Sequence, residues 1–224
     1  MRVLQVLDKG PADGGVAVHV EALSAGLRRA GHQVQTLRLL PPAQPAPLRE
    51  GDRHRLAAGD GVLDGLRQRA ALATILHDVE PQVIHVHGGF GRISPPLLAQ
   101  LRPDVVLLPC FTDRHADHFA ANRCLVAAGD RLGAGACTSL GVLGFEAGAP
   151  MYANLVVDVA PVYDRKLRAI ACHASQTASA DNLGGVDGLN RFRGVAAMAR
   201  TTHAEAFLAA PLATYGRLYE RLLP

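Results

Sequence analysis

A short apolar run followed by a cluster of ionisable side chains constrains this chain more than any other stretch. Residues 105–108 read Val-Val-Leu-Leu between Pro103 and Pro109, which predicts a strand buried on both faces of a parallel sheet. Two carboxylates and two imidazoles follow directly: Asp113, His115, Asp117 and His118. Parallel α/β sheets place their sites outside the carboxyl ends of strands. The pattern predicts such a site, or equally a polar surface loop leading into a helix at 119–128.

The elements on either side of this loop predict an α/β fold. A strand at residues 2–7, a helix at 16–30 and a strand at 34–39 form a βαβ unit, whose right-handed crossover implies parallel strands. We expect one domain over residues 1–224, with a Rossmann-like, mainly parallel sheet and helices on both faces. Further elements are expected as strands at 81–87 and 154–159 and helices at 62–77, 162–172, 195–208 and 213–223. Residues 49–55 are charged and polar and are expected as a surface loop. Residues 129–148 and 176–193 are glycine-rich and have little regular hydrophobic period.

Composition favours a globular protein over one that binds nucleic acid or membranes. Hydrophobic residues make up 49% of the chain and charged residues 19%, with a net charge of +3, which is typical of a folded domain. The arginines are scattered and aromatic residues are few, so nucleic-acid binding has little support. Four cysteines without a C-x-x-C pair indicate reduced thiols. No signal peptide or membrane-spanning run is found, so we expect a cytoplasmic protein and leave a homo-oligomer open.

Two further features come from the first ninety residues. Gly14 and Gly15 follow the first strand and precede a helix, where glycine lets a backbone approach a ligand and the helix N-terminus attracts an anion. They are candidate substrate-binding residues, although a tight strand-to-helix turn needs the same residues. His85 and His87 share one face of the strand at 81–87. They are compatible with metal ligation or with the commoner role of histidines at the rim of a sheet.

Several motifs of the second half occur in the order found in one enzyme family. They are Pro-Asp-Val-Val-Leu-Leu-Pro at 103–109, Asp-Arg-His-Ala-Asp-His at 113–118, a run at 157–170, Ser175 with Gln176, and Ala-Glu-Ala-Phe at 204–207. Over about residues 99–210 the chain thus resembles the PIG-L/LmbE family of zinc-dependent sugar N-deacetylases, and its nearest members look like the GlcNAc-malate deacetylases of bacillithiol synthesis. The resemblance implies that His118 binds zinc, that His115 stabilises the oxyanion and that Asp117 orients His115.

The other half of that family's zinc site is altered here. The family has His-Pro-Asp-Asp after its first strand, and this chain has Gly-Pro-Ala-Asp at residues 10–13. Aligned on the proline, Asp13 is the one remaining metal ligand of that motif and alanine replaces the family's base. Aligned by the length of the first strand, Asp13 is lost as a ligand as well. Asp8, at the end of the first strand, is the candidate substitute base, because amide hydrolysis needs a group that takes the proton of water. Arg53 and Gln176 are the candidate substrate-binding residues that the resemblance implies.

The first half, about residues 1–98, is similar to a different family. Residues 1–39, with Gly14, Gly15 and the Gly-His pair at 31–32, and the run Pro-Gln-Val-Ile-His-Val-His-Gly-Gly at 81–89 resemble the N-terminal domain of family 4 glycosyltransferases, which have the GT-B fold. That family's second domain and its Glu-x7-Glu element are not found in the sequence. A seam is expected near residues 94–102, and a natural fusion, a recombined gene and a designed sequence are all compatible with it.

The leading functional prediction is therefore a zinc-dependent hydrolase that removes an acetyl group from an N-acetylglucosamine-type conjugate. Activity is expected to be impaired if the altered motif at residues 10–13 leaves zinc weakly held. One alternative is a non-catalytic domain that binds a sugar or nucleotide sugar. The other is the N-terminal half of a glycosyltransferase that needs a partner chain. A small sugar conjugate is the expected partner in the first case.

Overall fold

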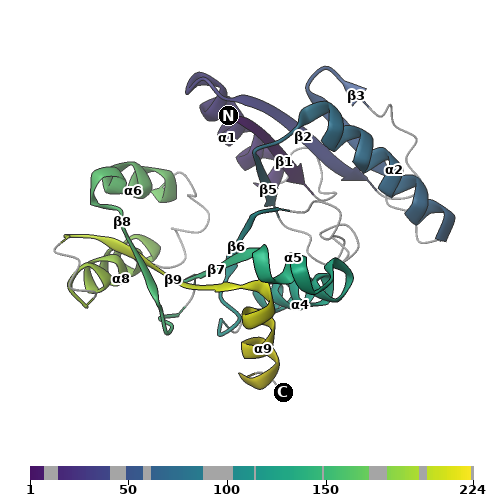
Figure 1. Ribbon diagram of the computed structural model, residues 1–224. Helices are drawn as coiled ribbons and strands as arrows, with labels where there is room; N and C mark the ends of the chain where they lie inside the picture. The colour runs from purple at the N-terminus through teal and green to yellow at the C-terminus, as the bar shows by residue number, and fades with distance from the viewer. Residues whose placement is uncertain are drawn as a thin grey trace. The chain divides into compact units, whose positions relative to one another are not determined.

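The computed structural model describes residues 1–7, 15–40, 49–57, 62–87, 103–113, 115–147, 149–171, 181–196 and 201–222. The chain divides into two compact units, Met1–Arg102 and Pro103–Pro224 (Figure 1). Asp8, Asp13, Gly14 and Gln176 lie outside the described residues. Within the described ranges, no helix is long and apolar enough to cross a membrane.

The N-terminal unit contains a sheet of five described strands. They are β1 (Arg2–Leu7), β2 (Gln33–Leu40), β3 (Arg49–Glu50), β4 (Arg53–Ala57) and β5 (Val83–His87). The order across the sheet is β3-β4-β2-β1-β5. β1 pairs in parallel with β2 and β5, β2 pairs in parallel with β4, and only the short β3 at the edge is antiparallel. The predicted βαβ unit and its parallel strands are therefore confirmed.

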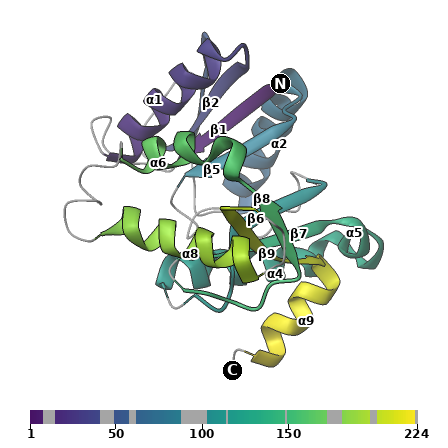
Figure 2. The ribbon, with the colours of Figure 1, turned by 90° about the vertical axis from the view of Figure 1, so that its left-hand side faces the viewer.

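Helices α1 (Gly15–Arg29) and α2 (Val62–Val79) lie on opposite sides of this sheet (Figure 2). Leu4 and Leu37 on one sheet face pack with Leu72 of α2 in a core from which water is excluded, and burial of such side chains is the main stabilising term of a small unit. α1 ends where Gly31 takes a φ of +83°, a conformation that favours glycine at a helix C-terminus.

The C-terminal unit contains a mixed sheet of four described strands. They are β6 (Val105–Pro109), β7 (Gly141–Phe145), β8 (Leu155–Asp158) and β9 (Ala204–Pro211). The order is β6-β7-β9-β8. β6 and β7 are parallel, whereas β9 is antiparallel to both of its neighbours. The described strands thus form two sheets, and no single sheet continues across the seam predicted at 94–102 among them.

Five α-helices accompany this sheet in the described residues. They are α4 (Ala116–Leu132), α5 (Ala134–Ser139), α6 (Tyr163–Ala171), α8 (Asn182–Ala196) and α9 (Leu212–Leu222), and a single 3-10 turn, η1 (Ala160–Val162), precedes α6. Phe111, Leu125, Val142 and Tyr215 belong to one buried cluster that joins α4 and α9 to the sheet. The predicted fold class, α/β with a mainly parallel sheet flanked by helices, is confirmed by the N-terminal sheet.

Three expectations about local structure are wrong. β6 is the edge strand of its sheet, and Val105 and Leu107 are 49% and 59% exposed instead of buried on both faces, because a short apolar run does not distinguish an edge strand from a central one. Residues 49–55, expected as a surface loop, contribute β3 and the start of β4. The helix expected at 195–208 is replaced by the end of α8 and the strand β9.

Candidate functional site

The loop between β6 and α4 holds the ionisable cluster that the sequence singles out. His115 is the N-cap of α4: it has an extended backbone, and its Nδ1 accepts a hydrogen bond of 3.2 Å from the backbone N–H of Asp117. Asp113 Oδ1 in turn accepts a hydrogen bond of 3.0 Å from the backbone N–H of His115. A side chain that accepts from the first turn of a helix satisfies a donor with no partner inside the helix. Local capping therefore fixes the shape of this loop.

This capping bond determines where a neutral His115 carries its proton. Because Nδ1 accepts from a backbone N–H, the proton of the neutral imidazole must sit on Nε2. His115 is exposed, so its Nε2–H is available to donate to an external acceptor. This is the chemistry that stabilisation of an oxyanion requires.

His118 has a different neighbour. Its buried Nδ1 lies 3.0 Å from Asp113 Oδ2, which is within ion-pair distance, but this nitrogen makes no hydrogen bond among the described residues. A carboxylate beside the second nitrogen of an imidazole is common behind histidines that bind metals. Asp113, to which sequence analysis gave no role, thus contributes the carboxylate beside His118.

The two rings and Asp117 complete the geometry of the loop. The centroids of His115 and His118 lie 4.7 Å apart, with the rings tilted by 36°. The Asp117 carboxylate is 3.9 Å from His115 Nδ1 and its side chain is 83% exposed, so the backbone of Asp117 makes the closer contact with His115. The structure therefore brings three of the four predicted loop residues, His115, His118 and Asp113, into one small group.

The other predicted site residues that the structure describes belong to the N-terminal unit. Arg53 begins β4, is exposed and forms a 3.3 Å ion pair with Glu21 of α1. Gly15 is the first residue of α1. His87 is buried, and its Nε2 lies 2.6 Å from Gln5 Oε1, while its ring centroid is 3.9 Å from that of His85. This contact fits the role of histidines at the rim of a sheet.

Zinc needs three or more protein ligands. Among the residues that the structure describes, no group of three or more His, Cys, Asp or Glu side chains could hold a metal ion. Asp13, the second predicted ligand, belongs to the part of the chain that is not described.

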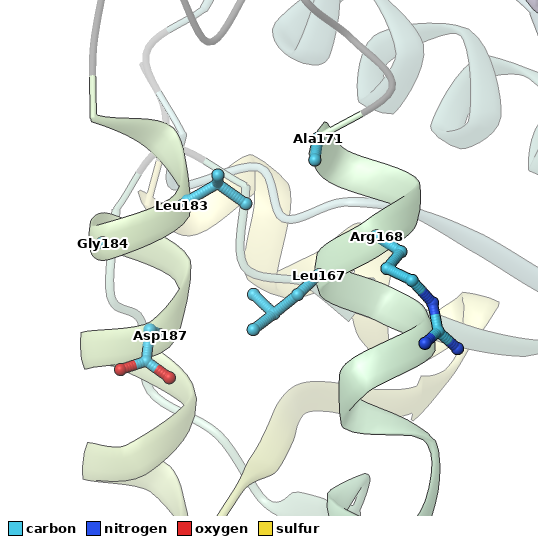
Figure 3. Close-up of a pocket in the computed structure, with 6 residues that line it drawn as sticks. All are labelled: Leu167, Arg168, Ala171, Leu183, Gly184 and Asp187. Carbon is cyan, nitrogen blue, oxygen red and sulfur yellow. The ribbon is translucent and has the colours of Figure 1, made fainter.

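A cavity of about 430 Å³ lies between α6 and α8. Leu167 and Leu183 point into the space between the two helices, and Arg168 points away from it (Figure 3). The lining residues are Leu167, Arg168, Ala171, Leu183, Gly184 and Asp187. Apart from Asp187 and Arg168 the walls are apolar or glycine. None of the predicted site residues that the structure describes lines this cavity.

Asp187 also belongs to a polar cluster that sequence analysis missed. Its carboxylate accepts hydrogen bonds from Tyr163 Oη at 2.8 Å and from Arg191 Nε at 2.7 Å, and lies 3.3 Å from His203 Nε2. The Tyr163 and His203 rings are stacked at 3.6 Å. Burial and the Asp187 carboxylate raise the pKa of Tyr163 to about 12. The segment at 176–193 has no regular hydrophobic period, so only the distant pairing of α6 with α8 reveals the cluster.

Comparison with known proteins finds one family model. The model of Glycosyltransferase Family 4 matches residues 13–111, in agreement with the resemblance of the N-terminal part to family 4 glycosyltransferases. The matched segment is less than half of the chain, begins after β1 and ends just beyond β6. It therefore runs past the seam expected near residues 94–102. No protein of curated function matches the sequence.

Three of the solved structures that match this chain have identities of 20% or less. The conserved protein TT1542 from Thermus thermophilus has 20% identity and a TM-score of 0.46, covering 94% of this chain and 96% of its own. The 4-carboxy-2-hydroxymuconate hydratase GalB from Pseudomonas putida has 18% identity and a TM-score of 0.42, covering 93% and 96%. The N,N'-diacetylchitobiose deacetylase from Pyrococcus horikoshii has 16% identity and a TM-score of 0.42, covering 96% and 85%.

Proposed function

We propose that this chain is a zinc-dependent hydrolase that removes an acetyl group from an N-acetylglucosamine-type conjugate. One observation carries the proposal: two neighbouring imidazoles of one loop have different surroundings. His115 Nδ1 accepts from a backbone N–H and leaves Nε2–H as a donor, whereas His118 Nδ1 lies beside the Asp113 carboxylate. In the proposal, His118 Nε2 is the nitrogen that binds the metal. A site for amide hydrolysis needs both kinds of group, one for the oxyanion and one for a metal.

Each residue of the chain has a distinct task in this proposal. His115 Nε2–H donates to the carbonyl oxygen as negative charge develops on it. His118 Nε2 and Asp13 would hold zinc, which would supply a Lewis acid when bound. The Asp113 carboxylate beside His118 Nδ1 would favour the tautomer whose Nε2 can bind a metal. Asp8 takes a proton from the attacking water and returns it to the amide nitrogen as the C–N bond breaks, which gives acetate and a free amine.

Metal analysis and acetate release test this assignment together. The protein would be purified without chelators, its zinc measured by mass spectrometry, and acetate release followed on a panel of N-acetylglucosamine conjugates. We expect His118→Ala to lose zinc and activity together. We expect His115→Ala to keep zinc and to lower kcat by about 100-fold, because removing one oxyanion donor costs about that much.

His77→Ala is the matched control for these histidine variants, because His77 is an exposed histidine near the end of α2 in the N-terminal unit. It should leave both zinc content and acetate release unchanged. A metal-free wild-type protein whose acetate release is the same in His118→Ala would rule out the deacetylase.

A second candidate function is favoured by the family-model match over residues 13–111. In this alternative the chain binds a sugar or nucleotide sugar without catalysis, or works as the N-terminal half of a glycosyltransferase with a partner chain. A nucleotide sugar would then raise the melting temperature and zinc would not. Co-purification with a second chain that carries a Glu-x7-Glu element would favour the split transferase over the binding domain.

A further inference from the structure

The side chain of Asn122 spans the loop that carries His115 and His118. Asn122 is in the second turn of α4 and is completely buried. Its Nδ2 donates to two carbonyl oxygens, that of Pro109 at 2.8 Å and that of His118 at 2.8 Å. Pro109 is the last residue of β6 and His118 is in the first turn of α4. One amide group therefore ties together the two ends of the loop.

Tyr215 of α9 fixes the orientation of this amide. Its hydroxyl donates a hydrogen bond of 2.7 Å to Asn122 Oδ1. A side-chain amide can rotate by half a turn and exchange its oxygen with its nitrogen. That rotation would turn the oxygen toward two carbonyl oxygens and leave the tyrosine donor without an acceptor. The hydroxyl of Tyr215 thus selects the orientation in which Asn122 bridges the loop.

Tyr215 is itself held firmly in place. It is completely buried, and the edge of its ring meets Phe111 with the centroids 5.1 Å apart. Gly144 of β7 leaves room for its hydroxyl, because a Cβ at that position would lie 3.1 Å from the Tyr215 oxygen. Burial raises the pKa of Tyr215 well above its usual range, so its hydroxyl stays a donor at every pH at which the protein is folded.

We propose that Asn122 and Tyr215 are positioning residues that set the geometry of residues 110–118, and through it the direction in which His118 faces. The C-terminal helix α9 thereby controls a site that is formed by residues nearly a hundred positions earlier in the sequence. What the loop binds rests on the proposed function. The link from Tyr215 through Asn122 to the loop, here called the tether, rests only on the contacts of these two residues.

Tyr215→Phe tests the tether, because it removes one hydroxyl and keeps the ring. Amide hydrogen exchange of residues 110–118 and the affinity for Zn²⁺ would be measured for the wild type and the variant. We expect the amide exchange rate of residues 110–118 to rise about tenfold relative to the rest of the C-terminal unit, because one buried hydrogen bond is lost. We expect Zn²⁺ to bind about tenfold more weakly, as it does when groups behind a ligand are removed.

Tyr163→Phe is the matched control. It removes a tyrosine hydroxyl from a hydrogen bond of similar length in the same unit, between α6 and α8. It should leave exchange in 110–118 and Zn²⁺ affinity within about twofold of the wild type. If both variants raised exchange in 110–118 alike, or if Tyr215→Phe raised it evenly over the whole unit, the tyrosine would serve general stability alone and the proposal would be overturned.

The exchange and zinc measurements separate this proposal from the proposed function. A wild-type protein that binds no Zn²⁺ through His118 would end the deacetylase assignment. The exchange comparison would still decide whether Tyr215 tethers the loop, because it needs no metal. Zinc binding that is unchanged in Tyr215→Phe while the loop loosens would overturn the link from the tether to His118.

Discussion

At the scale of single residues, Asp187 is the clearest case of a side chain whose charge is set by its neighbours. Hydrogen bonds from Arg191 and Tyr163 hold the pKa of the Asp187 carboxyl below its usual range. The folded state therefore binds a proton at this carboxylate less readily than the unfolded state does. The ionised carboxylate contributes stability that is present above the unfolded pKa of about 4 and is lost as the pH falls through the lower folded value.

Asp187→Asn should therefore change how stability depends on acid. We expect the wild type to lose melting temperature more steeply than Asp187→Asn as the pH falls below the unfolded pKa of about 4, because the wild-type carboxylate becomes protonated there. Thermal unfolding followed by circular dichroism across that range is the measurement. Asp130→Asn, at an exposed position of α4, is the control and should follow the wild-type slope. Equal slopes for the wild type and Asp187→Asn would contradict the prediction.

The same scale shows how much of the candidate site the sequence predicts. The spacing of His115, Asp117 and His118 after an apolar run was enough to locate the loop and to identify its histidines. The sequence did not indicate which nitrogen of His115 accepts a hydrogen bond, because that depends on the backbone N–H of Asp117. Nor did it indicate Tyr215, which is far away in the chain and is brought in by the packing of α9 on the sheet.

At the scale of elements, strands and helices with a clear hydrophobic period were predicted and the others were not. β1, α1, β2 and α2 were predicted within two residues of their observed bounds. β9 was mistaken for a helix because its alanine-rich sequence has high helix propensity, and pairing with β7 and β8 on both sides overrides that preference. α8 was missed because glycines at 184, 185, 188 and 194 weaken its helical pattern.

One of these glycines is needed for packing and another is not, which gives a prediction for α8. A Cβ at Gly194 would lie 2.6 Å from the carbonyl oxygen of Thr201, which precedes β9, whereas a Cβ at Gly188 would meet nothing within 4 Å. We expect Gly194→Ala to lower the free energy of unfolding by about 1–3 kcal/mol through overpacking. Gly188→Ala should raise it by about 0.5–1 kcal/mol through helix propensity and loss of chain entropy.

Urea denaturation of both glycine variants provides the test. The two substitutions add the same methyl group to the same helix, so propensity alone would shift both in the same direction. A Gly194→Ala protein as stable as Gly188→Ala would show that α8 does not approach the Thr201 backbone closely.

At the scale of the whole molecule, each unit has a buried core of its own. Leu4 and Leu72 belong to the core of the N-terminal unit, and Val142 and Leu208 to that of the C-terminal unit, with no residue shared between the two clusters. Compact units with separate cores can unfold as separate cooperative transitions. The division after Arg102 lies at the edge of the seam predicted near 94–102, whereas the family-model match runs across this division to residue 111.

Calorimetry of two core variants tests whether the cores are independent. Leu4→Ala removes a fully buried side chain from one core, and Leu208→Ala removes a buried side chain of the same type from the other. Each should cost about 2–5 kcal/mol, which for a unit of about 100 residues lowers the transition temperature by roughly 8 °C or more. We expect two transitions in the wild type, with each variant lowering a different one. A single transition that both variants lower by the same amount would show that the two cores unfold together.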